Sequence, residues 1–172
     1  RRAGRVLLLK SAKQGLGDLT LGATHQFAVP ADQPWAWAAG AEVKLGTASA
    51  EKSLGTGKDD FAAHVDVYYT AGSFTPFLTL SHRWLGNPPG SSLRNHFFGT
   101  AGIQWACSDR ITLGALVDWA DKNSVGGTTS VSYSIAISRT CGPDWQAQLY
   151  GVGGRSDNTP DHGGGLSLSR RF

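Results

Sequence analysis

The sequence contains no methionine and only two cysteines among its 172 residues. Since the initiator methionine is missing too, we expect that an export signal was cleaved and that the chain is the mature product; a segment cut for expression is the alternative. No stretch approaches the run of roughly 20 apolar residues that a membrane-spanning helix needs. The net charge of +3 is mild and the basic residues are scattered, so the sequence offers no basic face for nucleic acid.

The two cysteines, Cys107 and Cys141, are each predicted to lie at a turn on the same rim of the fold, two strands apart. In an oxidising compartment such thiols can pair, although two strands is a tight distance for a disulfide. The sequence does not decide between a disulfide and two free thiols. It contains no CxxC pair and no Cys/His spacing typical of zinc, so we expect neither a metal site nor a cofactor.

Glycine and aromatic residues are abundant, with 23 Gly, 7 Phe, 6 Trp and 4 Tyr. This composition favours many short strands with tight turns. Alternation with a period of two residues is the dominant pattern, and it is clearest over residues 130–138, where large apolar residues alternate with serines. The same alternation recurs over residues 18–27, 35–46, 61–70, 78–84, 100–105, 111–119 and 165–172.

Each predicted strand therefore has one apolar face and one face of polar, small or charged residues. In a water-soluble barrel or sandwich the apolar face points inward, whereas in a membrane barrel it faces lipid. Strands of about ten residues and aromatic residues near the strand ends favour the membrane barrel. The predicted interface anchors are Trp35, Trp37, Phe61, Phe74, Trp84, Trp105, Trp119, Trp145 and Phe172.

The predicted connections alternate between short turns, such as 71–73 and 141–144, and longer loops, such as 48–60 and 86–95. This asymmetry is typical of outer-membrane barrels. We predict a single domain over residues 1–172, all-β, an antiparallel up-and-down transmembrane β-barrel of about ten strands in a bacterial outer membrane. Nine of these strands are clear. The remaining one, which would be the first in the chain, covers residues 5–13; it is a continuous apolar run, so the pattern does not show which side chains face lipid.

The C-terminal residues Leu166, Leu168 and Phe172 resemble the signal that outer-membrane barrels present to the barrel-assembly machinery, with Arg170 departing from the usual aromatic residue. Several segments also resemble the MetA-pathway phenol-degradation family of outer-membrane barrels. These are residues 15–22, 43–47, 54–60, 143–145 and 159–168, with Gly46 where the family tends to have proline. The resemblance implies a membrane barrel linked to small apolar or aromatic compounds, and it implies no catalytic residues.

Seven polar residues are predicted by parity to point into the barrel lumen, where they either line a narrow water path or form a salt-bridged plug: Glu42, Lys44, His64, Asp66, Arg83, Asp118 and Arg171. His64 and Asp66 share a face, as a water-activating pair would, but the favoured interpretation is a hydrogen-bonded lumen pair that balances Lys44 or Arg83. The leading hypothesis is a non-enzymatic pore or binder for small apolar or aromatic molecules. The alternatives are a structural barrel with a plugged lumen and partner-binding loops, and an integral outer-membrane hydrolase.

Overall fold

The computed structural model describes residues 14–156 and 159–170, and these residues form one antiparallel sheet. Its strands are β1 (Leu19–Gln26), β2 (Trp35–Leu45), β3 (Asp60–Tyr69), β4 (Phe74–Trp84), β5 (His96–Ser108), β6 (Ile111–Ala120), β7 (Ser130–Thr140), β8 (Trp145–Gly154) and β9 (His162–Arg170). The all-β, antiparallel prediction is confirmed. The predicted first strand, residues 5–13, lies outside the described residues. No helix occurs in the described part, so none there could cross a membrane.

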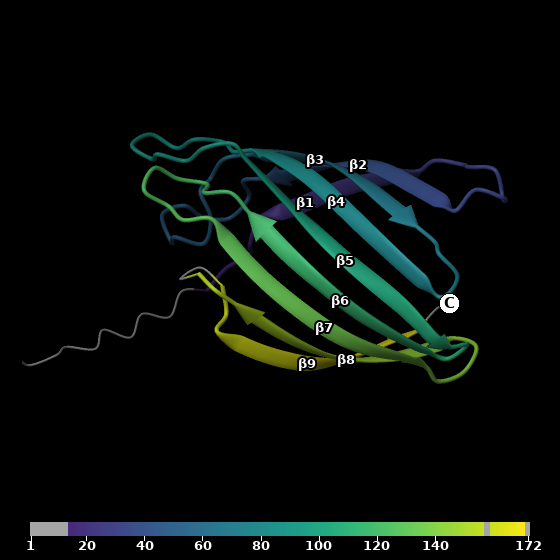
Figure 1. Ribbon diagram of the computed structural model, residues 1–172. Helices are drawn as coiled ribbons and strands as arrows, with labels where there is room; N and C mark the ends of the chain where they lie inside the picture. Colours follow the sequence, from purple (N-terminus) through teal and green to yellow (C-terminus); the bar gives the residue numbers. More distant parts are fainter. Residues whose placement is uncertain (1–13, 157–158, 171–172) are drawn as a thin grey trace, which may run out of the picture.

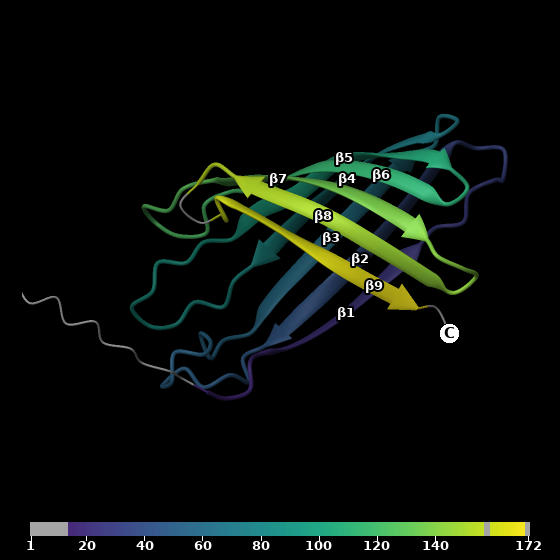
Figure 2. The same ribbon diagram turned by 90° about the horizontal axis from the view of Figure 1, so that it is seen from below.

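The strands are paired strictly in chain order, from β1 to β9. The sheet twists and curls into a trough whose two edge strands, β1 and β9, lie on the same side of the molecule (Figures 1 and 2). The closed barrel predicted from the sequence is not formed, because no pairing joins β1 to β9 within the described residues. Eight successive antiparallel pairings make β1 and β9 run in the same direction, so a further strand between them is needed to close the sheet with antiparallel pairing throughout.

The register places apolar residues opposite one another from one edge of the sheet to the other. Leu21 is paired with Val43, Val65 with Leu80, and Leu149 with Leu166. Because side chains alternate between faces along a strand, these pairings extend over the same face of the sheet. The alternation predicted from the sequence is therefore present, in register, across all nine strands.

Within residues 14–156 and 159–170, nothing covers this apolar face. Its large side chains remain exposed, up to 68% for Ile135 and 77% for Leu166. The few buried side chains, such as Ala38, Ala62 and Ser81, lie on the opposite face by parity. The polar face is thus the sheltered inner side of the trough, and the hydrophobic residues form an outer coat rather than a core.

The connections sort by length between the two ends of the trough. Loops 46–59, 85–95 and 121–129 gather at one end, which we call the long-loop rim, together with residues 155–156 and 159–161 (left in Figure 1). The connections 27–34, 70–73, 109–110 and 141–144 lie at the other end, the short-turn rim. The alternation of short and long connections predicted from the sequence is confirmed, although the 27–34 connection is longer than the other turns of its rim.

Candidate functional site

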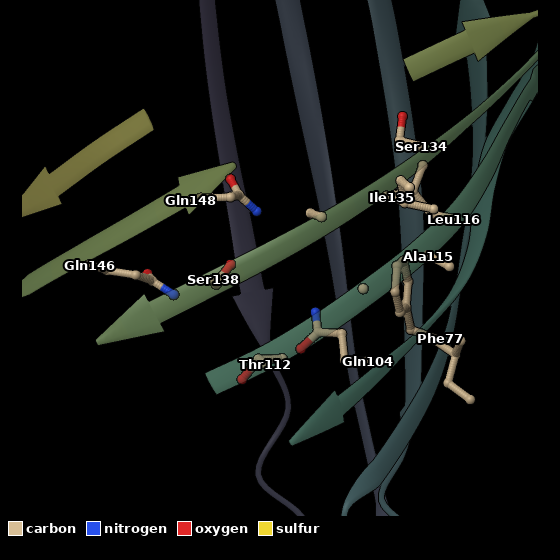
Figure 3. Close-up of a pocket in the computed structure, with 13 residues that line it drawn as sticks. Phe77, Gln104, Thr112, Ala115, Leu116, Ser134, Ile135, Ser138, Gln146 and Gln148 are labelled. Atoms are coloured by element: carbon tan, nitrogen blue, oxygen red, sulfur yellow. The ribbon is translucent and has the colours of Figure 1, made fainter. Parts of the chain in front are cut away.

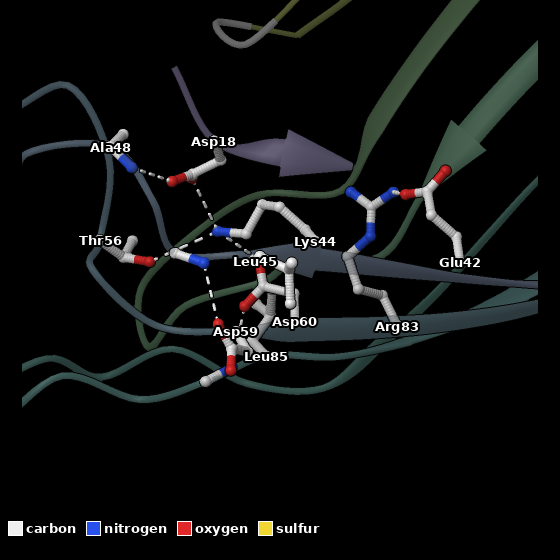
Figure 4. Close-up of polar contacts among 12 residues, drawn as sticks. Asp18, Glu42, Lys44, Leu45, Ala48, Thr56, Asp59, Asp60, Arg83 and Leu85 are labelled. Atoms are coloured by element: carbon white, nitrogen blue, oxygen red, sulfur yellow. Dashed lines mark hydrogen bonds and ion pairs between the residues drawn. The ribbon is translucent and has the colours of Figure 1, made fainter. Parts of the chain in front are cut away.

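The inner face carries a group of charged residues near the long-loop rim, which we call the charged cluster: Asp18, Glu42, Lys44, Asp60, His64, Asp66 and Arg83. Lys44, close to the end of β2, is its centre. The Lys44 Nζ lies 2.8 Å from an oxygen of Asp60 and 3.2 Å from an oxygen of Asp18 (Figure 4). A third contact runs from Nζ to the Thr56 hydroxyl at 3.5 Å. One cation thus joins the start of β1, the start of β3 and the loop between β2 and β3.

The carboxylates of this rim also fasten loop backbone. Asp18 accepts a hydrogen bond from the Ala48 amide at 2.9 Å, and Asp59 accepts one from the Gly46 amide at 2.8 Å (Figure 4). Asp60 accepts a third from the Gly86 amide at 2.9 Å. The backbone hydrogen bond from Ala48, followed by the contact with Lys44, lowers the pKa of the Asp18 carboxyl from its usual 3.8. The ionised form of Asp18 is therefore the one that holds loop 46–59 in place.

The other charges of the inner face are also partnered. Arg83 lies 3.8 Å from Glu42, on the far side of β3 (Figure 4). Its guanidinium carbon lies 4.8 Å from the ring centre of Phe98. Asp118, on β6, accepts a hydrogen bond from the Thr100 hydroxyl at 2.5 Å. Lys44, Glu42, Arg83 and Asp118 thus pair with neighbours that sequence reasoning did not assign. Arg171 lies outside the described residues.

His64 and Asp66 share the inner face, as parity predicted, with 3.6 Å between His64 Nε2 and the nearer Asp66 oxygen. The Thr24 hydroxyl lies 3.2 Å from the same ring nitrogen, and Asp66 accepts a bond of 2.6 Å from Thr79. The pair does not balance Lys44 or Arg83, which have other partners. A hydrolytic relay places the hydroxyl and the carboxylate on opposite ring nitrogens. Here the Thr24 hydroxyl and the Asp66 carboxylate both lie near Nε2 of His64, so the three side chains form a polar network rather than a relay.

Ser81 is directly opposite His64 in the β3–β4 register and is only 4% exposed. Sequence reasoning missed this neighbour because it depends on strand register, which alternation alone does not give. Among the described residues the Ser81 hydroxyl makes no hydrogen bond to His64. His82, next along β4, lies on the outer face between Trp84 and Phe97, with ring centres 4.4 and 4.5 Å away.

A second feature of the inner face lies near the short-turn rim and contains no charge. We call this the uncharged pocket, a cavity of about 290 Å³. In Figure 3 the side chains of Gln104, Ser138, Gln146 and Gln148, which come from three strands, border one region of the inner face. Its lining is made by Phe77, Ile103, Gln104, Thr112, Gly114, Ala115, Leu116, Ser134, Ile135, Ala136, Ser138, Gln146 and Gln148. No sequence motif marks these residues, since they come from five different strands.

The predicted anchors are on the outer face, at both rims. At the short-turn rim Phe74 stacks on Trp105, with 5.7 Å between ring centres. At the long-loop rim Phe61 contacts Trp84, with 5.3 Å between ring centres. The remaining described anchors also lie near strand ends: Trp35, Trp37, Trp119 and Trp145. Phe172 lies outside the described residues.

The outer face is hollowed over β6 to β9, where glycines replace larger residues. This apolar groove of about 640 Å³ is lined by Leu113, Ile135, Ile137 and Leu149 together with Gly151, Gly163 and Gly164. Opposite Ile135 in the register stands Gly151, which is itself opposite Gly164. Three adjacent strands therefore present one large side chain and two glycines, which leaves a depression in the outer coat.

Cys107 and Cys141 are both exposed and both free, so the disulfide that the sequence allowed is not formed. Cys107 lies within β5 rather than at a turn, and Cys141 follows β7. Since β6 separates the two strands, two spacings of about 4.8 Å place the backbones about 10 Å apart. A disulfide tolerates a Cα separation of about 7 Å at most.

Within residues 14–156 and 159–170, no three His, Cys, Asp or Glu side chains come together as a metal site would require. Comparison of the chain with protein-family models and with curated proteins finds no match. The resemblance to the phenol-degradation family thus depends on the short segments quoted above, and the candidate site is defined by its geometry alone.

Proposed function

We propose that this chain is the wall of an outer-membrane β-barrel that lets small molecules pass or binds them. The observation that carries the proposal is the exposed apolar face, which continues in register across every described strand. Water disfavours such a surface by about 25 cal/mol per Å² of apolar area, whereas lipid tails do not. An outward apolar coat around a polar interior is the arrangement expected of a membrane barrel.

The spacing of the aromatic rings agrees with the thickness of a bilayer core. Strand β4 spans 11 residues from Phe74 at the short-turn rim to Trp84 at the long-loop rim. Ten steps of about 3.3 Å give about 33 Å along the strand. At a tilt of about 40° this length covers about 25 Å, which is the height of the apolar band in outer-membrane barrels. The two sets of rings would then lie at the two interfaces.

The finer architecture belongs to the same proposal. A tenth strand, formed by residues 5–13, would run antiparallel to both β1 and β9 and would close the barrel. The described chain supports this direction, because β1 begins at the long-loop rim, where residues 14–18 lead into it. An even number of strands is also the rule for bacterial barrels of this kind.

Two features bear on whether the barrel conducts. The charged cluster gathers side chains and loop 46–59 at one rim, which favours a plugged lumen. The uncharged pocket and the apolar groove favour binding or passage of small molecules. We propose the second function, with apolar or aromatic cargo as the family resemblance implies. A barrel that is purely structural is the alternative that the charged cluster supports.

The first test is purification with and without detergent, followed by circular dichroism and electrophoresis before and after boiling. A β-rich chain that is soluble only in micelles and migrates differently when unboiled is the expected result. A freely soluble monomer would refute the proposal. Recording from planar bilayers then separates the two functions, since a steady conductance indicates a pore and silence indicates a plug.

Closure by residues 5–13 is tested with a single substitution. Leu8→Pro places a residue without an amide donor in the proposed strand and should abolish the gel shift on boiling. Ala3→Pro, outside the proposed strand, is the matched control and should leave the shift intact. If both variants behave like the unaltered chain, the barrel closes by some other means.

A further inference from the structure

The uncharged pocket presents six hydrogen-bonding side chains to one space. Gln104, Gln146 and Gln148 contribute amides, each with donors and an acceptor, and Thr112, Ser134 and Ser138 contribute hydroxyls (Figure 3). None of these six side chains forms a hydrogen bond with another described residue. This differs from the charged cluster, where Lys44 and Arg83 pair with carboxylates. The pocket therefore has free hydrogen-bonding capacity that a ligand or water must satisfy.

The pocket also has an apolar wall. The ring of Phe77 lies against Gly102 of the next strand, where an added Cβ would meet the ring at 2.6 Å. The absence of a side chain at Gly102 thus allows the ring to lie flat along the sheet. Leu116 borders the same space. A ligand here meets hydrogen-bonding groups on one side and an aromatic ring on the other.

Neither the charge nor the size of the pocket suits an ionic or polymeric ligand. No lining residue is acidic or basic, so a charged group entering the pocket would lose water without gaining a counter-ion. Its volume of about 290 Å³ is at the small end of the range for ligand pockets, about 300–1,000 Å³. The space suits a single ring rather than a chain of rings.

We propose that the uncharged pocket binds a neutral, hydroxyl-bearing ring compound of the size of one monosaccharide, with its apolar face on Phe77. The inference rests on the proposed barrel but not on the cargo implied by the family resemblance. The amides of Gln104 and Gln148 bind the hydroxyl groups, and the absence of charge in the lining excludes acidic and basic analogues. The ligand reaches the pocket from the short-turn rim, to which its polar residues are nearest.

The test uses the full chain in a zwitterionic detergent, because glucoside detergents would compete. Ligand-observed NMR titration compares methyl β-D-glucopyranoside with methyl β-D-glucuronide and with glucosamine. The neutral glycoside should bind at least about tenfold more tightly than either charged compound. Gln104→Leu combined with Gln148→Leu should weaken its binding at least about tenfold. Gln26→Leu is the matched control, since Gln26 lies on the inner face near the same rim but outside the pocket.

Gln148→Glu serves as a second variant, because it preserves size and adds one negative charge. It should bind glucosamine more tightly and the neutral glycoside more weakly. Equal binding of the three compounds, or unaltered binding by the double variant, would overturn the proposal. So would the absence of binding to a chain that shows the gel shift on boiling, while the barrel itself would stand. A chain without that shift would instead refute the proposed barrel.

Discussion

A charge placed at the middle of the outer face distinguishes lipid from water as its surroundings. Ile135 is the central residue of β7, which runs from Ser130 to Thr140, and its side chain is 68% exposed. Five steps of about 3.3 Å separate it from either strand end, about 17 Å along the strand and about 13 Å in depth at a tilt of about 40°. In a barrel with an apolar band about 25 Å tall, Ile135 lies at the midplane.

The substitution Ile135→Arg should therefore cost about 2–4 kcal/mol of the free energy of unfolding if lipid surrounds the sheet. Val131, on the same face but one step from the end of β7, provides the matched control. Val131→Arg should cost about 0–1 kcal/mol, because its guanidinium reaches the interface. In water the same Ile135→Arg change, at an exposed surface site, should lie within about 0.5 kcal/mol of zero.

The assay is urea denaturation of the chain refolded into phosphatidylcholine vesicles, followed by tryptophan fluorescence. The linear dependence of the free energy on urea gives both the stability and the slope for each variant. A difference of about 2 kcal/mol or more between Ile135→Arg and Val131→Arg is the expected result. Equal costs at the two depths would contradict the reasoning, because no depth-dependent environment would then exist.

Three further predictions follow from local geometry. The backbone hydrogen bond and the ion pair lower the pKa of Asp18 below 3.8 in the folded chain. The stabilisation of loop 46–59 by ionised Asp18 is therefore fully present above pH 3.8 and is lost as the pH falls through the lowered pKa. Pepsin should cleave this loop faster in that acid range, and the Asp18→Asn variant should show no such pH step. Gly99→Ala should lower the free energy of unfolding by about 1–3 kcal/mol, because the added Cβ would lie 2.2 Å from a backbone oxygen. An added Cβ at Gly114 meets open space, so Gly114→Ala should be neutral or stabilising in the same denaturation assay. Equal effects of the two substitutions would refute the steric argument. Both Cys107 and Cys141 should react with a maleimide reagent without prior reduction, and mass spectrometry showing neither labelled would indicate a disulfide instead.

Local alternation was sufficient to predict where the strands are. Residues 130–138, with apolar residues at every second position, fall within β7, and the loops 48–60 and 86–95 separate strands as expected. This succeeded because the period of two is a property of each strand alone. The assignment of Lys44 to the inner face depended on the same parity and agrees with its ion pairs.

Partners across strands were harder to predict, because they depend on register and on loops. The partners of Lys44 are Asp18 and Asp60, which lie just outside or at the start of strands, where alternation gives no facing. The opposition of His64 and Ser81 is likewise a consequence of the β3–β4 register. The uncharged pocket collects residues from β4 to β8 that share no motif, so sequence reasoning had no pattern from which to find it.

The division of the inner face suggests how a barrel of this kind would select its solutes. Near the long-loop rim the charges neutralise one another, with Lys44 between two carboxylates and Arg83 beside Glu42. A charged solute gains little from Lys44 or Arg83, because each of these cations already has a carboxylate partner at 2.8–3.8 Å. Near the short-turn rim it meets a lining without any charge and loses its hydration without compensation. If the chain forms the proposed barrel, a neutral solute would satisfy the free amides and hydroxyls of the second half without the loss of hydration that an ion would suffer there.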